Sequence, residues 1–415
     1  MKKSSQPLTV ALVLVSASLT ILTKCSYDVA APMWDKPFTA PPTPSITQIQ
    51  PSAAPPGVNT IVISGQNLGG VPNTDGVYFG TTPTEVVQKS ATSVTVRRPA
   101  LETDSCTVKL VSDSALIVAK VSFGKIDPVM RRIGGFRDNI MLAVVAVDSV
   151  ENLYVVSGLS PATIWKVTPD DARTALTTSG SALRPPYDAV MRGDVMYLMS
   201  SNREIQQVNL ATGAASRWTQ MPSGKVVRFG DFDAHGYFYT GGVAGCDLCV
   251  VPPNPPATLT LAQIMVVGSY ATEEILSIRV AKGYLYVASR SSSQNPVKIW
   301  RHLLDTAGQV GPQEPVLDLG AFSAFSSRVV KGLSFSETGV IYLTTDAEEP
   351  LLVFNPADNT LDYFYKAIIP PYGKHADWGT GTYLYMVSGD AANADPSLRW
   401  NIARLDVGAR GASLR

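Results

Sequence analysis

Residues 282–290 read KGYLYVASR, a Lys-Gly turn followed by residues that alternate in the manner of a β-strand. The same phrase recurs at five other places in the chain. The six copies are centred on Tyr154, Tyr197, Tyr239, Tyr286, Tyr342 and Tyr385, at intervals of 43, 42, 47, 56 and 43 residues. A period of this size in strand-like sequence is typical of a propeller blade or another solenoid unit.

Other short strands surround each tyrosine strand. An apolar strand precedes it, as in GDFDA (230–234), and two more follow it, as in TIWKVTP (163–169) and ARTALTT (172–178). Four antiparallel strands repeated six times predict a six-bladed β-propeller over residues 125–415. The tyrosine strand is then the second strand of each blade. We expect the tyrosine rings in the core, with each hydroxyl bonded to the backbone.

The sixth repeat ends near Gly408 without an outer strand. Upstream of the first repeat, PVMRRIGG (128–135) has the pattern of an outer strand and no blade of its own. We therefore expect residues 129–135 to pair with 401–406 and to close blade six. Closure of this kind removes an open sheet edge, which would otherwise promote aggregation.

The segment DSVENLYVVSGLSPATIWKVTPD (148–170) resembles the repeat of NHL-type and related six-bladed propellers. The resemblance covers about 280 residues and implies architecture alone. Some six-bladed relatives are metal-dependent lactonases, which hold a divalent ion with Glu, Asn and Asp at the channel. Quinoprotein dehydrogenases are another class of propeller enzyme.

Upstream of the propeller, residues 44–124 contain short alternating runs separated by Gly and Pro. About 80 residues of such strands are typical of an immunoglobulin-like sandwich. Three stretches resemble an IPT/TIG domain: PSITQIQPSAAPPGVNTIVISGQNLGG (44–70), GVYFGTTPTEVV (76–87) and SATSVTVRRPA (90–100). Such domains serve as spacers and as binding modules, so the resemblance implies fold more than function.

The N-terminal segment has the features of an export signal. Lys2 and Lys3 precede an uncharged run from Leu8 to Leu22, which is shorter than the roughly 20 residues that span a bilayer. The sequence Leu-Thr-Lys-Cys at 22–25 resembles a bacterial lipobox, although a small residue is usual where Lys stands. The resemblance implies a signal peptide at 1–24 and a lipid on Cys25. The alternative is an ordinary signal peptide, cleaved within 29–31.

Residues 25–43 are rich in proline and predict an extended tether between membrane and sandwich. Ser26 replaces the Asp that favours inner-membrane retention in lipoproteins of enteric-type bacteria. The predicted location is therefore the cell envelope, with the outer membrane favoured and its side left open.

Lys plus Arg and Asp plus Glu are both 34, so the formal net charge is zero. This balance implies no basic face for nucleic acid. The compartments that exported proteins enter favour oxidised thiols, so we expect a disulfide between Cys246 and Cys249. Cys106 then stays unpaired, and we expect it to be a small buried residue. Val250 excludes a c-type haem site, and no second Cys or His pair supports structural zinc.

Propeller ligands bind at the mouth of the central channel, near the start of each innermost strand. The residues that we place there are Arg137, Asp188, Arg228, Asp231, Glu274, Lys331 and His375. One interpretation of this mixed-sign ring is a solvated funnel of self-compensating pairs. For a lactonase-like metal site the available residues are Glu274, Asp188, Asp231 and Asn139. Spacing singles out no catalytic residue, no metal ligand set and no cofactor site.

The first hypothesis is a non-enzymatic binding or scaffold lipoprotein, whose propeller face binds a protein or a glycan outside the cytoplasm. The alternative is a propeller enzyme with its site at the channel mouth, either a metal-dependent lactonase or hydrolase or a sugar dehydrogenase. A purely structural envelope protein is a third possibility. A metal found by elemental analysis would favour the enzyme.

Overall fold

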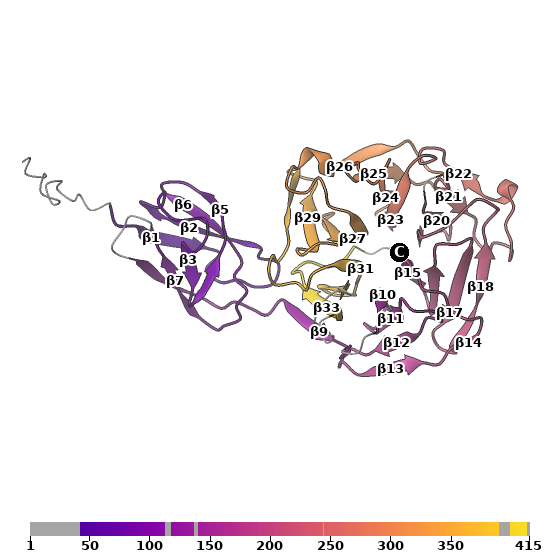
Figure 1. Ribbon diagram of the computed structural model, residues 1–415, viewed down its shortest axis with the longest axis horizontal. Coiled ribbons are helices and arrows are strands. Elements are labelled where there is room, and N and C mark those ends of the chain that lie inside the picture. Colours follow the sequence, from indigo (N-terminus) through magenta and orange to yellow (C-terminus); the bar gives the residue numbers. More distant parts are fainter. Residues whose placement is uncertain (1–41, 113–117, 137–139, 244, 390–398, 413–415) are drawn as a thin grey trace, which may run out of the picture.

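The computed structural model describes residues 42–112, 118–136, 140–243, 245–389 and 399–412. The expected signal peptide and Cys25, most of the tether, and Arg137 and Asn139 lie outside these residues. The fold is all-β, with a sandwich beside a ring of six sheets (Figure 1). Two 3-10 turns, η1 (Leu261–Gln263) and η2 (Leu319–Ala321), lie among the strands, and no helix within the described residues is long and apolar enough to cross a membrane.

The sandwich contains two four-stranded sheets. One has the order β1 (Ser45–Gln50), β2 (Thr60–Gln66), β6 (Ser93–Arg97), β5 (Val86–Lys89), and the other β4 (Thr82–Thr84), β3 (Val77–Phe79), β7 (Cys106–Leu110), β8 (Ala119–Phe123). Alternate residues of both sheets face one another and are fully buried, including Ile61, Val94, Phe79 and Val108. The immunoglobulin-like fold predicted for 44–124 is thus observed.

The first three blades of the ring have their strands in chain order. Blade one contains β10 (Leu142–Val147), β11 (Leu153–Ser157), β12 (Ile164–Val167) and β13 (Arg173–Leu176). Blade two contains β15 (Asp188–Arg192), β16 (Val195–Met199), β17 (Glu204–Asn209) and β18 (Ala214–Gln220), with β14 (Ser179–Gly180) parallel to β18. Blade three contains β19 (Phe229–Phe232), β20 (Phe238–Gly241), β21 (Cys249–Val251) and β22 (Met265–Val266).

Two of the remaining blades follow the same order, and the last does not. Blade four contains β23 (Glu274–Ala281), β24 (Tyr284–Arg290), β25 (Lys298–Leu303) and β26 (Glu314–Asp318). Blade five contains β27 (Val330–Phe335), β28 (Ile341–Thr345), β29 (Leu351–Asn355) and β30 (Thr360–Tyr363). Blade six contains β31 (Gly373–Trp378), β32 (Tyr383–Gly389), β33 (Trp400–Asp406) and, as its outer strand, β9 (Met130–Ile133).

The closing strand lies where the strand count predicts it. β9 pairs antiparallel with β33, with Ile133 opposite Ile402 and Met130 opposite Leu405. Because β9 precedes blade one and β33 ends blade six, this pairing joins the two ends of the ring. It also covers the edge of β33, which would otherwise be unpaired.

A carboxylate strengthens the same junction. Glu151 lies in the turn between β10 and β11 of blade one, and its Oε1 accepts hydrogen bonds from Thr380 N (2.6 Å) and Gly381 N (3.1 Å) of blade six. Its Oε2 accepts from the hydroxyl of Tyr385 (2.6 Å). Burial raises the pKa of Glu151, but these hydrogen bonds outweigh it and hold the pKa below its ordinary value.

The repeated tyrosines are core residues, as expected, except that Tyr286 is only half-buried. The prediction that each tyrosine hydroxyl bonds to the backbone is wrong for three of the six. The hydroxyls of Tyr239 and Tyr385 donate to Asp233 (3.1 Å) and Glu151 (2.6 Å), and that of Tyr154 lies 3.4 Å from Asp148. A carboxylate is the stronger acceptor for a buried hydroxyl, because its hydrogen bond is charge-assisted.

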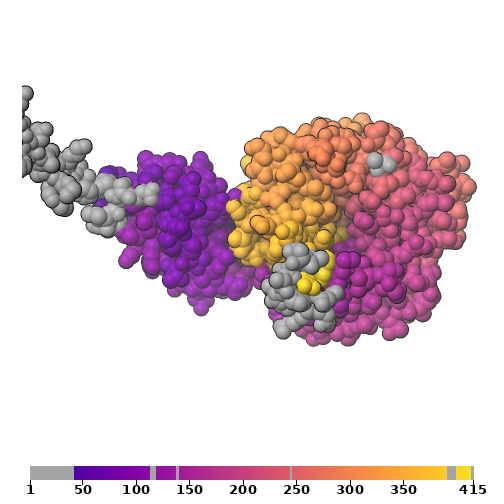
Figure 2. All heavy atoms as spheres, in the orientation of Figure 1, coloured from indigo at the N-terminus to yellow at the C-terminus, as the bar shows by residue number. Residues whose placement is uncertain are grey.

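The sandwich contacts the ring through blade five and the loop that follows it (Figure 2). Arg97 donates two hydrogen bonds to the carboxylate of Asp362 at the end of blade five. Asn59 donates to Tyr363 O (2.7 Å) and accepts from Tyr365 N (2.9 Å). Figure 1 views the ring face-on, and the sandwich lies beside it. The line that joins the centres of the two domains therefore lies in the plane of the ring.

Candidate functional site

The centre of the ring is closed by a polar cluster from alternate blades. Asp188 begins β15 of blade two, Arg279 lies within β23 of blade four, and His375 lies within β31 of blade six. Arg279 donates to both oxygens of Asp188, from Nη1 (2.8 Å) and Nη2 (2.9 Å). His375 Nε2 lies 2.8 Å from Asp188 Oδ1. The three side chains are at most 6% exposed, so the cluster is sealed from solvent.

One tautomer of His375 satisfies both ring nitrogens. With its proton on Nε2, the imidazole donates to Asp188, and Nδ1 accepts from Val145 N at 3.4 Å. Burial raises the pKa of Asp188, but the charge of Arg279 and the hydrogen bond from His375 outweigh it and lower that pKa. Burial likewise lowers the pKa of Arg279, and the charge of Asp188 reverses this effect. The cluster is therefore a buried ion pair.

Further side chains join the inner strands of neighbouring blades. Asp188 Oδ2 accepts from Gly230 N (3.2 Å), and Asp231 Oδ2 accepts from Val280 N (2.9 Å). Ser277 Oγ accepts from Leu333 N in the next blade (3.2 Å). Blade six is joined to blade one in the same manner, through Asp377 and Val147 N (2.9 Å). These groups hold the ring together around its axis.

Three of the residues expected at an open mouth are therefore buried instead. Asp188, Asp231 and His375 are at most 2% exposed, and their polar atoms are used within the ring. For Asp188 and His375 the physical reason is Arg279, which extends from blade four and contacts both, whereas Asp231 is bound by the backbone amides of Phe232 and Val280. Arg279 is not among the residues predicted from the sequence for the channel mouth. Its sequence signal is an isolated charge inside the apolar strand ILSIRVA (275–281).

The remaining expected residues do lie at the starts of inner strands. Arg228 precedes β19 and donates to Ser201 Oγ (2.9 Å), and its Nη1 lies 3.3 Å from Glu274 Oε1. Glu274 is also bound by Arg290, whose Nη2 lies 2.8 Å from Oε2. Lys331 pairs separately with Asp346 (3.0 Å). The mouth is thus a set of compensated ion pairs, as the funnel interpretation expects.

A cavity of about 440 Å³ lies beside this mouth on blade four. Its principal lining residues are Glu273, Arg290, Asn295, Lys298, Trp300 and Asp318. Lys298 pairs with Asp318 (3.3 Å), and Arg290 pairs with Glu274, so both cations of the lining are compensated. Because Arg290 belongs to both regions, the cavity and the channel mouth share a side chain.

Trp300 is the distinctive residue of this cavity. Its indole Nε1 is buried and has no hydrogen-bond partner among the described residues. A buried donor without a partner is costly, of the order of 1–3 kcal/mol, so this indole N–H is an unsatisfied polar group in the cavity wall. Trp300 is not among the binding residues predicted from the sequence. Its signal is the match of KIWR (298–301) to TIWK (163–166), beside the polar run SSSQNP (291–296).

The acidic residues offered for a divalent metal do not fit one. Arg279 and His375 occupy the oxygens of Asp188, backbone amides of Phe232 and Val280 donate to Asp231, and two arginines bind Glu274. Across the described ranges, no group of three or more His, Cys, Asp or Glu side chains is arranged to hold a metal ion. Asn139 lies outside those ranges.

The disulfide expected between Cys246 and Cys249 is not formed in the structure. The Sγ of Cys246 donates to Gly224 O (3.3 Å) and accepts from Val226 N (3.3 Å), whereas the Sγ of Cys249 lies 3.8 Å from Cys246 O. Each sulfur thus has partners of its own. Burial raises the pKa of Cys249 to about 11, which makes it a poor nucleophile. Cys106 is free and half-buried.

Comparison with known proteins identifies the sandwich. Residues 44–124 match the family described as the IPT/TIG domain. No curated protein sequence matches the chain. The N-terminal domain is therefore an IPT/TIG domain.

Solved structures resemble the chain at low identity. Regucalcin, a calcium-binding protein from Agrobacterium tumefaciens, is 13% identical over 68% of this chain and 97% of its own, with a TM-score of 0.50. An auxiliary nutrient binding protein from Bacteroides ovatus is 10% identical over 88% and 99%, with a TM-score of 0.46. A luciferin-regenerating enzyme is 13% identical over 69% and 99%, with a TM-score of 0.49. At these identities the likeness to regucalcin supports the propeller fold and no activity.

Proposed function

We propose that this chain is an exported, lipid-anchored binding protein whose propeller holds a neutral glycan in the blade-four cavity. The observation that carries the proposal is the unpartnered indole N–H of Trp300, buried in a cavity lined by polar side chains. A volume of about 440 Å³ falls within the range of small-ligand sites. The Nε1 atom is closed to solvent in this structure, so a sugar hydroxyl would supply the missing acceptor after a small movement of the Trp300 ring.

The charges of the cavity favour an uncharged ligand. Lys298 is paired with Asp318 and Arg290 with Glu274, so no net charge of one sign faces the cavity from these pairs. Carboxylate, amide and guanidinium groups offer many hydrogen bonds to vicinal hydroxyls, and an aromatic ring offers an apolar contact to the face of a sugar. A neutral oligosaccharide matches this combination better than an anionic ligand.

The state of the acidic groups favours binding over catalysis. A general acid or base must reach its substrate within hydrogen-bond distance. Asp188 is fully buried and neutralised, and Glu274 is bound by two arginines. The most tightly bound acidic groups therefore stabilise the ring, whereas the polar groups of the cavity remain available to bind a ligand.

Attachment to the membrane through Cys25 completes the proposal. Residues 25–43 would hold the sandwich away from the lipid, and the sandwich in turn contacts blade five, not the lining of the blade-four cavity. Replacing Cys25 by Ala should release the protein from the membrane fraction after export. If the variant partitions like the parent, the anchor lies elsewhere.

The test is a titration of the full-length mature chain with neutral hexasaccharides of glucose, mannose and xylose, followed by calorimetry and tryptophan fluorescence. We expect at least one to bind, and Trp300→Phe to weaken that binding about tenfold through loss of one hydrogen bond. Trp165→Phe is the matched control, because Trp165 occupies the corresponding position in blade one.

Equal binding by the Trp300→Phe and Trp165→Phe variants would place the sugar elsewhere on the protein. Failure of every neutral hexasaccharide to bind would reject the glycan. A stoichiometric metal in the purified protein, together with lactone hydrolysis that requires it, would favour the enzyme alternative.

A further inference from the structure

A second surface with ligand-binding features lies on the IPT/TIG domain, on the outer face of the sheet β4-β3-β7-β8. One cross-strand row runs over this face: Pro83 stands opposite Tyr78, Tyr78 opposite Lys109, and Lys109 opposite Lys120. The flanking residues Phe79, Val108 and Leu110 point into the core, so the row points outward. Tyrosine and two lysines thus lie on adjacent strands of one face.

The two lysines are unfavourable to the fold by themselves. Like charges directly opposite each other on antiparallel strands are destabilising. Neither ammonium group has a hydrogen bond or ion pair with another described residue, and the same holds for the hydroxyl of Tyr78. Other cations of this domain have partners: Arg97 pairs with Asp362, Lys89 donates to Val71 O (2.8 Å), and Arg98 donates to Pro55 O (2.8 Å). The repulsion between Lys109 and Lys120 therefore calls for an explanation outside the fold.

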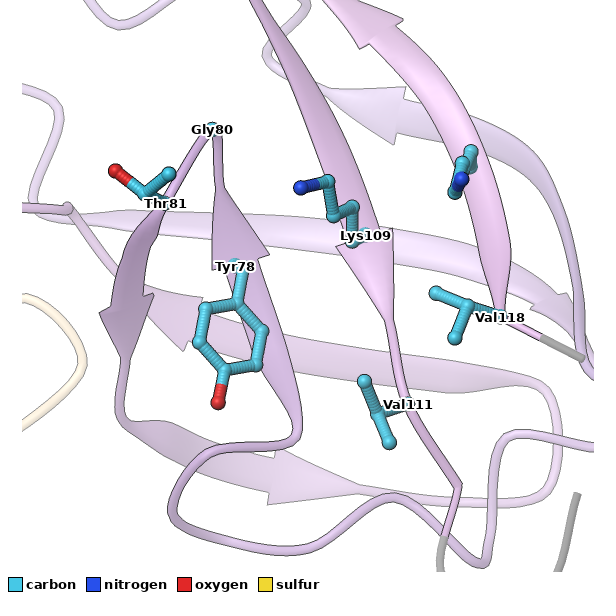
Figure 3. A pocket seen from close by; sticks show the side chains of 7 residues that line it. Tyr78, Gly80, Thr81, Lys109, Val111 and Val118 are labelled. Carbon is cyan, nitrogen blue, oxygen red and sulfur yellow. The ribbon is translucent and has the colours of Figure 1, made fainter. Parts of the chain in front are cut away.

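The row borders a broad hollow of about 680 Å³. Besides the tyrosine and the lysines, its lining includes Gly80, Thr81, Val111 and Val118. Figure 3 shows the ring of Tyr78 and the side chain of Lys109 on neighbouring strands, with Val111 and Val118 further along the same face. The hollow therefore combines a basic side, an aromatic ring and an apolar side, and no carboxylate of the described residues belongs to its lining.

We propose that this hollow binds a carboxylated oligosaccharide, with a uronate residue between Lys109 and Lys120. Side chains directly opposite on two strands have Cβ atoms about 5 Å apart, so both ammonium groups can reach one carboxylate. Charge-assisted hydrogen bonds of this kind are the stronger class. The ring of Tyr78 and the valines offer the apolar contact that the face of a sugar ring requires.

This site is independent of the glycan proposed for the propeller. It lies on another domain, its lining shares no residue with the blade-four cavity, and its charge selects a different sugar. A chain with both sites would contact an acidic polysaccharide and a neutral one, or two regions of a mixed polymer. Failure of either site in an experiment leaves the other untouched.

The experiment titrates the full-length mature protein with tetragalacturonate and, as a matched probe, with the same tetrasaccharide fully methyl-esterified. We expect the acid form to bind and the ester, which lacks the charge, to bind at least about tenfold more weakly. Raising the salt from 50 to 500 mM should weaken the acid form alone, because exposed charges are screened. The double variant Lys109→Gln, Lys120→Gln should abolish the difference between the two probes.

Two controls separate this result from damage to the fold. Lys282→Gln removes one charge at an exposed propeller lysine and should leave binding unchanged. The double variant should unfold at the same temperature as the parent or higher, because it removes a like-charge pair. Tyr78→Ala should weaken both probes, since it removes the contact to the sugar ring.

Equal affinity for acid and ester, or equal affinity of the double variant and the parent for the acid, would overturn the proposal. Vesicles with anionic lipid provide the competing partner. Lysine-dependent binding to these vesicles without binding to tetragalacturonate would reassign the hollow to a membrane surface and would likewise overturn it.

Discussion

The channel centre and the blade-four cavity are both polar, and they differ in how their polar groups are satisfied. In the centre, Asp188 is held by Arg279 and His375, and all three side chains are buried. In the cavity, Lys298 and Asp318 are each almost half exposed, and the indole N–H of Trp300 has no partner among the described residues.

This difference separates structural polar groups from groups available to a ligand. A buried charge requires a fixed partner, because desolvation without one is very unfavourable. Once Arg279 supplies that partner, the central carboxylate has no capacity left for a ligand. An exposed pair such as Lys298–Asp318 keeps water as an alternative partner, so it can be rearranged at little cost. In this propeller we therefore expect recognition at the rim of the ring and stabilisation at its axis.

The largest expected effect is at the centre. Asp188→Ala leaves the charge of Arg279 buried without its partner, and breaking a buried pair in this manner costs about 3–5 kcal/mol. Chemical denaturation of the full-length chain, followed by far-UV circular dichroism, should show the propeller transition moved to lower denaturant. A loss below about 1 kcal/mol would mean that water reaches the channel and that the comparison with the cavity is wrong.

An intermediate effect is expected at the half-buried Glu151. Glu151→Gln retains the shape but loses the charge that the amides of blade six and Tyr385 bind, and we expect a loss of about 1–3 kcal/mol at pH 7. Unfolding of the parent and the variant at a series of pH values measures the difference. Glu204→Gln, at a carboxylate outside the junction between blades one and six, is the control.

The stability that Glu151 contributes depends on pH, and the sign of that dependence follows from its lowered pKa. Folding lowers the pKa of Glu151, so its contribution is fully present above the ordinary value of 4.5. As the pH falls below 4.5, the unfolded chain takes up a proton first, and the contribution is lost as the pH passes through the folded pKa. The parent and Glu151→Gln should therefore converge in acid. A difference that stays constant from pH 7 to pH 3 would contradict this.

The smallest effect is expected in the cavity. Asp318→Asn breaks the exposed Lys298–Asp318 pair and should change stability by no more than about 1 kcal/mol. Measured beside Asp188→Ala, it compares an exposed and a buried ion pair within one ring. Thermal unfolding of the two variants in the same buffer gives the result. A shift for Asp318→Asn as large as that for Asp188→Ala would remove the distinction between the two regions.

The architecture could be read from the sequence because its signals are local and repeated. Alternation within each strand, the recurring tyrosines and the Gly and Pro between strands all act over a few residues. The closing strand could be predicted from the number of strands. The sixth repeat lacks its outer strand, and residues 129–135 have the pattern of an outer strand but no blade of their own. The IPT/TIG domain was recognisable for the same reason, since its turns and strands appear in order along 44–124.

The candidate site depended on contacts that no local pattern encodes. Asp188 and Arg279 are 91 residues apart, and Arg279 and His375 are 96 apart, yet ring closure brings all three to one axis. Sequence position placed Asp188, Asp231 and His375 correctly on inner strands but could not show that Arg279 reaches from blade four to Asp188 and His375. The sequence by itself thus determined which strands form and how many blades they build, because these depend on alternation and period. Tertiary structure alone decided which polar side chains are neutralised inside the ring and which, like Trp300, are left without a partner, because burial and pairing depend on the closed ring.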